Sequence, residues 1–290
     1  MRGLSLPFFL LLAAVLSAQE RPSSCNSCPT WNIPQPAFRI YGNTYYVGTH
    51  GLSAILIASD KGHVLIDAAL PESVPHIVEN IRALGFRVED IKLIVNSHVH
   101  FDHGGGLAEM QRLSGAHVAA SAWTANVMNK GIVPRDDPQF GVIIPSPRIA
   151  KVETFEDGAT LSAGSVKVTA HLTPGHTPGG TSWTWTSCES GRCLQFVYAD
   201  SLTAVSADGY LYSQRKQYPR AEDFERSFAF LERTPCDILI TPHPEAGNLW
   251  DHMGQRVKDP DALINPAACR ALAGSLREKL KQRLASETAK

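Results

Sequence analysis

Hydrophobic and polar residues alternate along the first half of the chain in a way that predicts strands and then helices. Short apolar runs separated by glycine, serine and aspartate are typical of strands bounded by turns. From residue 73 the apolar period changes to that of an amphipathic helix, which Gly85 ends. The predicted strands are Tyr45–Val47, Ala54–Ala58, Val64–Ile66 and Leu93–Val95, and the predicted helices are Ser73–Leu84 and Gly104–Leu113.

The second half of the chain repeats this alternation after a polar loop at 134–147. Asn265 and Pro266 predict the start of a last helix, with asparagine as its N-cap and proline in its first turn. Two similar halves favour an α/β sandwich of four layers, with two mixed sheets inside and helices outside. The predicted strands are Val166–Val168, Phe196–Tyr198 and Ile238–Ile240, and the helix before the last is Phe224–Leu231.

The N-terminus has the pattern of a secretory signal peptide rather than of a folded element. Arg2 precedes an apolar stretch from Leu4 to Leu16, and Ala18 offers a small residue for cleavage before Gln19. The apolar stretch is shorter than the roughly 20 residues that a membrane span requires. We therefore expect a signal peptide at 1–18, a single catalytic domain at 19–290, and an exported, periplasmic protein without a membrane anchor.

Composition narrows the choice of partner. The chain has 290 residues, 43% of them hydrophobic and 19% charged, with a net charge of −1. This is ordinary globular usage, and the near-neutral balance gives no reason to expect a nucleic-acid partner. Basic residues gather only near the C-terminus, where leucines at helical spacing predict the solvated face of an amphipathic helix.

Export changes how the six cysteines are interpreted, because an oxidising compartment favours disulfides. Cys188 and Cys193 flank a turn-like stretch between two strand-like runs and are predicted to close a hairpin. Cys236 precedes an apolar strand and Cys269 lies in the last helix, so a bond between them would fasten that helix. Cys25 and Cys28 form a CxxC pair, for which a local disulfide or free thiols both remain open.

The strongest chemical signal is the segment His98-Val99-His100-Phe101-Asp102-His103, which follows a predicted strand. Imidazole and carboxylate ligands suit Zn²⁺. In extended chain, residues two apart point the same way, so His98 and His100 can share one metal. Asp102 and His103 are placed to turn toward a second metal, and the glycines at 104–106 allow a sharp bend into a helix.

Two more histidines complete a set of six ligands. His176 lies in a Pro/Gly-rich loop after one strand, and His243 lies in Thr241-Pro242-His243-Pro244 after another. The alternative is a histidine-rich loop that binds no metal, and the matching position of both histidines at strand ends argues against it. The other histidines lack such a setting and are interpreted as surface or packing residues: His50, His63, His76, His117, His171 and His252.

With these motifs the chain resembles the metallo-β-lactamase superfamily over roughly 40–270. The HxHxDH element is shared by glyoxalase II, lactonases and nucleases of the superfamily, so it indicates the fold and metals but not the substrate. Three further segments resemble subclass B3 of the zinc β-lactamases. They are Gly179-Gly180-Thr181-Ser182-Trp183-Thr184-Trp185, Tyr198-Ala199-Asp200-Ser201-Leu202-Thr203, and Thr241-Pro242-His243-Pro244.

The resemblance implies a role for each matching residue. His98, His100 and His176 would hold the first zinc, and Asp102, His103 and His243 the second, with Asp102 also the catalytic residue that orients the nucleophile. Ser201 and Thr203 would bind the substrate carboxylate, and Gln139 would line the cleft. Asp200 either orients the loop under the site or, as in glyoxalase-like members, bridges the metals. Val99 and His50 depart from residues common in relatives.

The implied activity is hydrolysis of the β-lactam amide of penicillins, cephalosporins and carbapenems by a metal-bound hydroxide, and hence antibiotic resistance. Two alternatives remain: a thioester or lactone hydrolase on the same fold, and a zinc-binding protein without catalysis. The expected partner is a small molecule, and a monomer is expected.

Overall fold

The computed structural model describes residues 25–214 and 219–289. The predicted signal peptide, 1–18, lies outside these residues. Within them, no helix combines the length and the apolar character needed to cross a membrane.

Among the described residues, the first sheet has seven strands that follow one another in the order of the chain. The first four pair antiparallel, and the last three join them in parallel, so this sheet is mixed as predicted. Its strands are β1 (Phe38–Tyr41), β2 (Thr44–Tyr46), β3 (Ile55–Ile57), β4 (His63–Ile66), β5 (Ile91–Val95), β6 (His117–Ser121) and β7 (Glu153–Phe155).

The second sheet, in the part of the chain that the structure describes, has five strands in the order β12-β11-β10-β9-β8. Only β11 and β12 pair in parallel. Its strands are β8 (Thr160–Ala163), β9 (Val166–Leu172), β10 (Thr181–Glu189), β11 (Arg192–Tyr198) and β12 (Ile238–Ile240).

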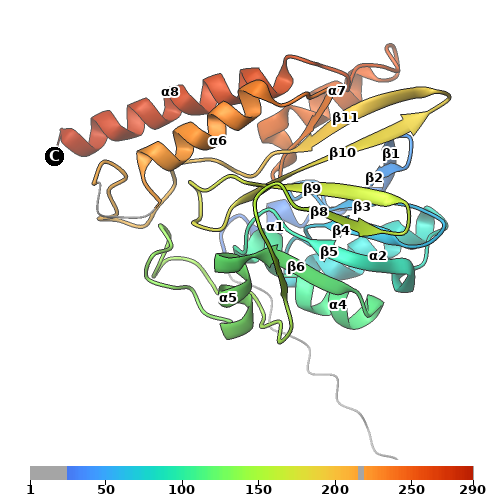
Figure 1. Ribbon diagram of the computed structural model, residues 1–290, viewed down its shortest axis with the longest axis horizontal. Helices are drawn as coiled ribbons and strands as arrows, with labels where there is room; N and C mark the ends of the chain where they lie inside the picture. The colour runs from blue at the N-terminus through green and yellow to red at the C-terminus, as the bar shows by residue number, and fades with distance from the viewer. Residues whose placement is uncertain (1–24, 215–218, 290) are drawn as a thin grey trace, which may run out of the picture.

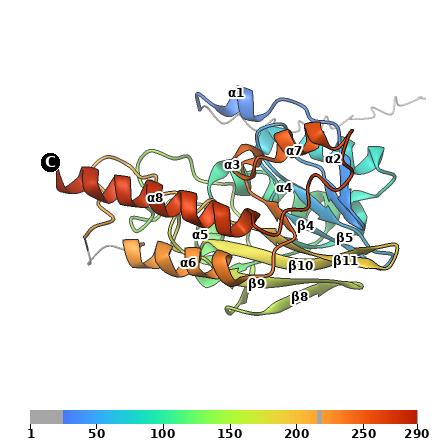
Figure 2. The ribbon, with the colours of Figure 1, turned by 90° about the horizontal axis from the view of Figure 1, so that it is seen from above.

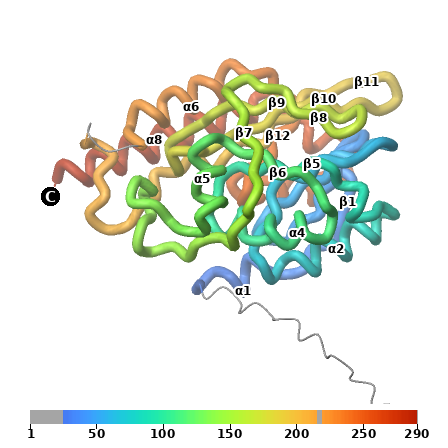
Figure 3. Tube along the Cα trace, turned by 60° about the horizontal axis from the view of Figure 1, so that its bottom comes forward, coloured from blue at the N-terminus to red at the C-terminus, as the bar shows by residue number. Residues whose placement is uncertain are grey.

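Helices cover the outer face of each sheet, as Figures 1 and 3 show. On the side of the first sheet lie α2 (Val74–Ala83), α4 (Leu107–Ser114) and α5 (Ala122–Lys130). On the side of the second lie α6 (Ala221–Arg233) and α8 (Ala268–Thr288), side by side in Figure 2. The remaining helices are α1 (Cys28–Trp31), α3 (Phe101–Gly104) and α7 (Leu249–Gln255), with 3-10 turns at Pro71–Ser73, Val88–Asp90 and Pro244–Gly247.

Three apolar cores separate these four layers. One lies between the first sheet and its helices and includes Ile77 and Met110; the middle core lies between the sheets and includes Trp183. The third lies between the second sheet and α6 and α8 and includes Phe228. The predicted four-layer sandwich is therefore confirmed.

The last helix begins later than predicted. α8 starts at Ala268, and the residue at its N-cap position is Ala267, not Asn265. The Asn265 carbonyl accepts a hydrogen bond from the Ala268 amide, and its side-chain oxygen accepts one from Ala267. Asn265 thus forms a turn before the helix, because an asparagine side chain satisfies nearby amides equally well in a turn and in a cap.

All six cysteines are paired within the described residues. Cys188 and Cys193 are directly opposite each other on β10 and β11, and the bond between Cys236 and Cys269 joins the segment just before β12 to α8. Both predicted pairings are present. Of the alternatives for Cys25 and Cys28, the structure has the local disulfide.

Candidate metal centre

The HxHxDH segment lies in the turn that leaves β5 and enters α3. Its backbone is extended at His100, whose carbonyl then accepts hydrogen bonds from the amides of His103 and Gly104. The glycines that follow allow two backbones to approach closely: a Cβ on Gly106 would lie 2.2 Å from the Ala68 carbonyl oxygen. The glycine run therefore fixes the bend that keeps all four polar side chains buried beside the strand ends.

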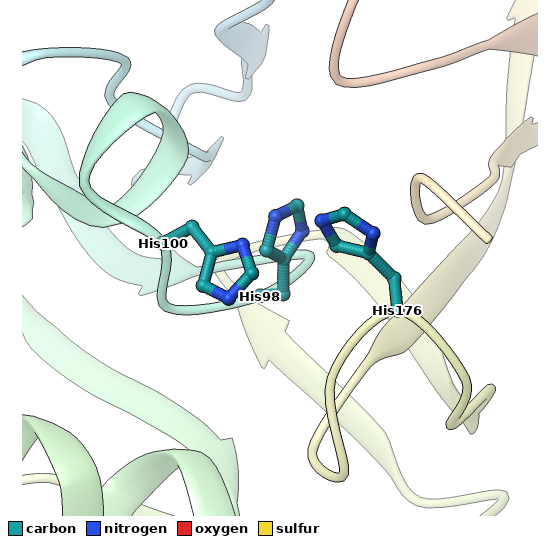
Figure 4. Close-up of side chains that lie close together, drawn as sticks. All are labelled: His98, His100 and His176. Atoms are coloured by element: carbon teal, nitrogen blue, oxygen red, sulfur yellow. The ribbon is translucent and has the colours of Figure 1, made fainter. Parts of the chain in front are cut away.

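Two groups of side chains in this region have the spacing of metal ligands. One consists of His98, His100 and His176, all buried, with one ligand atom from each within 4.8 Å of the others. Figure 4 shows His98 and His100 on one loop and His176 reaching toward them from the loop between β9 and β10. The structure therefore brings together the three residues predicted for the first metal.

The second group contains His98, Asp102 and His103 within the same distance limit. His243, after β12, joins this group through Asp102: one carboxylate oxygen, Oδ2, lies 3.3 Å from Nε2 of His103 and 3.3 Å from Nε2 of His243. The three residues predicted for the second metal therefore converge on one point. His98 lies at the boundary between the two groups.

The inward-facing nitrogens of the first group fit a metal ion. His98 uses Nδ1 to contact Asp200 Oδ1 at 2.8 Å, and its Nε2 is buried with no hydrogen-bond partner among the described residues. His176 Nδ1 donates to the Thr203 carbonyl at 2.9 Å, which leaves its Nε2 with a lone pair. Buried imidazole nitrogens without a proton are the atoms that bind zinc.

The electrostatics of His98, His176 and Asp102 agree with this interpretation. Burial, together with His103 and His100, holds the pKa of His98 well below its usual value, and burial with His98 and His100 lowers the pKa of His176 to about 3. Burial alone would raise the pKa of Asp102, but His103 and His243 outweigh it and hold that pKa well below its usual value. Neutral His98 and His176 and an ionised Asp102 are in the protonation states that bind a metal. Against the effect of burial, Asp102 helps to raise the pKa of His103, which must release its proton when a metal binds.

Two buried carboxylates stand behind the histidines. Asp200 contacts His98, and a Cβ on Gly180 would lie 2.3 Å from Asp200 Oδ2, so only glycine admits this carboxylate. Asp137 lies 3.0 Å from His100 Nε2 through Oδ2. Each carboxylate fixes the orientation of one ring. Asp200 lies outside both ligand groups, a position that fits the orienting role rather than the bridging one.

A cleft of about 320 Å³ opens over the ligand atoms. The residues predicted to bind substrate, Ser201, Thr203 and Gln139, all line it. The Gln139 amide nitrogen lies 3.4 Å from both His100 Nδ1 and His176 Nε2, and the Thr203 hydroxyl lies 3.1 Å from His176 Nδ1. Substrate-facing polar groups and metal-facing nitrogens therefore share one space.

Sequence reasoning missed three residues of this region. Asp137 lies two residues before Gln139, and this proximity in sequence was the only signal that could have identified it. Trp31 lines the cleft from α1 with its ring centroid 5.1 Å from that of His243, and Lys279 lines it from α8. These two come from opposite ends of the chain, and no local pattern marks either of them.

Comparison with known proteins agrees with this geometry. Residues 47–189 match the family model described as the metallo-beta-lactamase superfamily. The solved Rm3 metallo-beta-lactamase is 51% identical, covering 92% of this chain and 100% of that one, with a TM-score of 0.89. MEM-A1, a subclass B3 metallo-beta-lactamase from a soil metagenome library, is 46% identical, covering 89% of this chain and 99% of that one, with a TM-score of 0.87.

Curated relatives are more distant. The N-acyl homoserine lactonase AttM of Agrobacterium fabrum is 27% identical over 168 residues, which is 53% of this chain, and AttM of Rhizobium radiobacter is 28% identical over 164 residues. The chain spans 60% and 58% of the length of these two lactonases.

The fold and the histidine-rich site therefore define a metal-dependent hydrolase, and the chain belongs to the metallo-β-lactamase superfamily. Its solved structural neighbours include subclass B3 enzymes. The resemblance to the metallo-β-lactamase superfamily that the sequence motifs indicated is confirmed.

Proposed function

We propose that this protein is a zinc-dependent hydrolase that opens the amide bond of β-lactam antibiotics, including penicillins, cephalosporins and carbapenems. The observation that carries the proposal is the convergence of two ligand groups beneath a cleft lined by Ser201 and Thr203. Identity of 51% over the whole Rm3 metallo-beta-lactamase supports the same conclusion.

Two zinc ions fit the donor set of the site. We propose that His98, His100 and His176 hold one, and that Asp102, His103 and His243 hold the other. When bound, zinc acts as a Lewis acid and lowers the pKa of a bound water to about 7, which supplies a nucleophile at neutral pH.

The side chains of the chain then have separate tasks. Asp102 remains ionised because His103 and His243 stabilise its charge, so its carboxylate can accept a hydrogen bond from the attacking water and orient it. Asp200 and Asp137 keep the rings of His98 and His100 in the tautomer that leaves the inward nitrogen unprotonated. Ser201 and Thr203 are placed to bind the carboxylate of the substrate.

A lactone or thioester hydrolase on the same fold is the second candidate, and similarity to the AttM lactonases favours it. That similarity covers 53% of the chain at 27% identity, against 92% at 51% identity for the Rm3 enzyme. The β-lactam proposal therefore has the stronger support.

The decisive assay compares kcat/KM for a chromogenic cephalosporin, an N-acyl homoserine lactone and a glutathione thioester, all with the zinc-loaded protein. We expect the cephalosporin to be hydrolysed at least a hundredfold more efficiently than the other two. Preference for the lactone or the thioester would replace the proposed substrate class. Metal bound with no turnover of any of the three would favour a binding protein.

Ser201→Ala tests the carboxylate assignment separately. Loss of one hydrogen bond to a charged group costs about 1.5–3 kcal/mol, less where water replaces it. KM should rise several-fold with a smaller change in kcat, and zinc content measured by mass spectrometry should stay unchanged. Ser162 is exposed on β8 and lies outside the cleft lining, so Ser162→Ala is the matched control. An unchanged KM in Ser201→Ala would remove this residue from the substrate site.

We further propose that the protein acts as a monomer in the periplasm. Its three disulfides support an oxidising compartment. Cell fractionation locates the protein, and light scattering coupled to size-exclusion chromatography gives its mass. Cytoplasmic retention or a dimer would contradict the proposal.

A further inference from the structure

Helix α8 contributes a positive charge to the cleft over the ligand groups. The cleft-lining residues of this helix lie on one face at helical spacing: Leu272, Ser275, Leu276 and Lys279. Apart from the histidines, Lys279 is the only basic residue among the described residues that line the cleft, and Asp102 is the only acidic one. Since Asp102 is a proposed metal ligand, the lysine has no competing acid beside it in the cleft lining.

Lys279 differs in its contacts from the neighbouring basic residues of the helix. Arg277 forms ion pairs with two glutamates of α6, Lys281 pairs with Glu278, and Arg283 pairs with Glu287. For Lys279, which is exposed, no carboxylate of the described residues lies within ion-pair distance. Its ammonium group is therefore available to a ligand in the cleft.

The helix is fixed against the loop that carries the proposed substrate-binding residues. Arg283 donates to the Ala204 carbonyl at 3.1 Å and to the Ser206 hydroxyl at 2.7 Å. Lys279 precedes Arg283 by four residues, so it lies on the same face of α8 one turn away. These hydrogen bonds hold α8, and with it Lys279, on the side of the cleft next to the loop that follows Thr203.

We propose that Lys279 is a specificity-determining residue that binds the carboxylate next to the scissile amide of a β-lactam. The proposal rests on the proposed function. Ser201 and Thr203 offer hydroxyl groups, which donate hydrogen bonds but carry no charge. A carboxylate entering a cleft lined by Trp31 and Leu276 loses hydration, and a counter-charge offsets that loss. The long lysine stem packs along apolar surface and lets the ammonium group follow the bound anion.

Lys279→Gln tests this, because it keeps most of the side-chain length and removes the charge. Lys279→Arg restores the charge, and Lys281→Gln is the matched control, since Lys281 lies outside the cleft and pairs with Glu278. Benzylpenicillin and its methyl ester are each measured as competitors of a chromogenic cephalosporin. An ester that is not hydrolysed still yields an inhibition constant in this assay.

We expect Lys279→Gln to weaken benzylpenicillin binding about five- to tenfold at low salt, and less at high salt, with little change for the ester. Lys279→Arg and Lys281→Gln should resemble the unmodified protein. Equal weakening for acid and ester, or no weakening, would overturn the inference while leaving β-lactam hydrolysis intact. Failure of the unmodified protein to hydrolyse the cephalosporin would overturn both proposals.

Discussion

The buried carboxylate of Asp137 offers a sharp test of how the histidines are held. The side chain is 1% exposed, with Oδ2 3.0 Å from His100 Nε2 and Oδ1 accepting the Gln139 amide at 2.8 Å. Asp137→Asn preserves the shape but can present an NH₂ donor to His100 Nε2. The ring would then favour the tautomer with its proton on Nδ1, the nitrogen that faces the first ligand group.

The expected size of the effect follows from the buried contact between a carboxylate and a histidine that we propose as a zinc ligand. Changing such an outer partner typically weakens metal affinity about 10–100-fold, or roughly 1.4–2.7 kcal/mol. The loss should fall on the group of His98, His100 and His176, because Asp137 contacts only that group. Activity should therefore fall steeply at limiting zinc and recover in part when zinc is added.

Competition between the protein and a chromogenic zinc chelator measures this affinity directly. Asp136→Asn is the control, because Asp136 is the adjacent carboxylate, is exposed, and accepts a hydrogen bond from Trp123 rather than from a ligand. Thermal melting of both variants establishes that they fold. If folded Asp137→Asn binds zinc as tightly as Asp136→Asn does, the positioning role is refuted.

Three further predictions follow from other parts of the structure. EDTA should abolish hydrolysis and added zinc should restore it, and full activity in protein shown to be metal-free would contradict the site. Replacing Cys236 and Cys269 by alanine should lower the free energy of unfolding, measured with denaturant, by roughly 4 kcal/mol. The same replacement of Cys188 and Cys193 should lower it by roughly 2 kcal/mol, because that bond closes a shorter loop. Equal losses would contradict the loop-entropy argument. Burial lowers the pKa of His63 in the folded protein, so folding favours the neutral imidazole. The stability that neutral His63 contributes is complete above the unfolded-state pKa of about 6.5 and is lost as the pH falls below that value. The melting temperature of metal-free His63→Gln should then depend less on pH between about 5 and 7 than that of the unmodified protein, and parallel curves would contradict this.

The sequence by itself determined the chemistry of this protein, because that chemistry is encoded locally. Three imidazoles and a carboxylate within six residues after a buried strand predict a zinc site, since extended chain directs alternate side chains to one side. The hairpin disulfide was equally local, because Cys188 and Cys193 flank a turn. His176 and His243 were found because each follows an apolar strand and lies in a loop stiffened by proline or glycine.

Only the tertiary structure decided which groups support and surround those ligands. Asp200 is 102 residues from His98, and Lys279 and Trp31 come from opposite ends of the chain, yet all of them reach the site or its cleft. Their positions depend on how two sheets and their helices pack, and packing leaves no periodic trace in the sequence around such residues. The predicted start of α8 was wrong, because an asparagine satisfies free amides in a turn as well as in a cap. Motifs therefore predict which atoms could bind a metal, whereas packing decides which carboxylates contact those residues and which charges line the cleft.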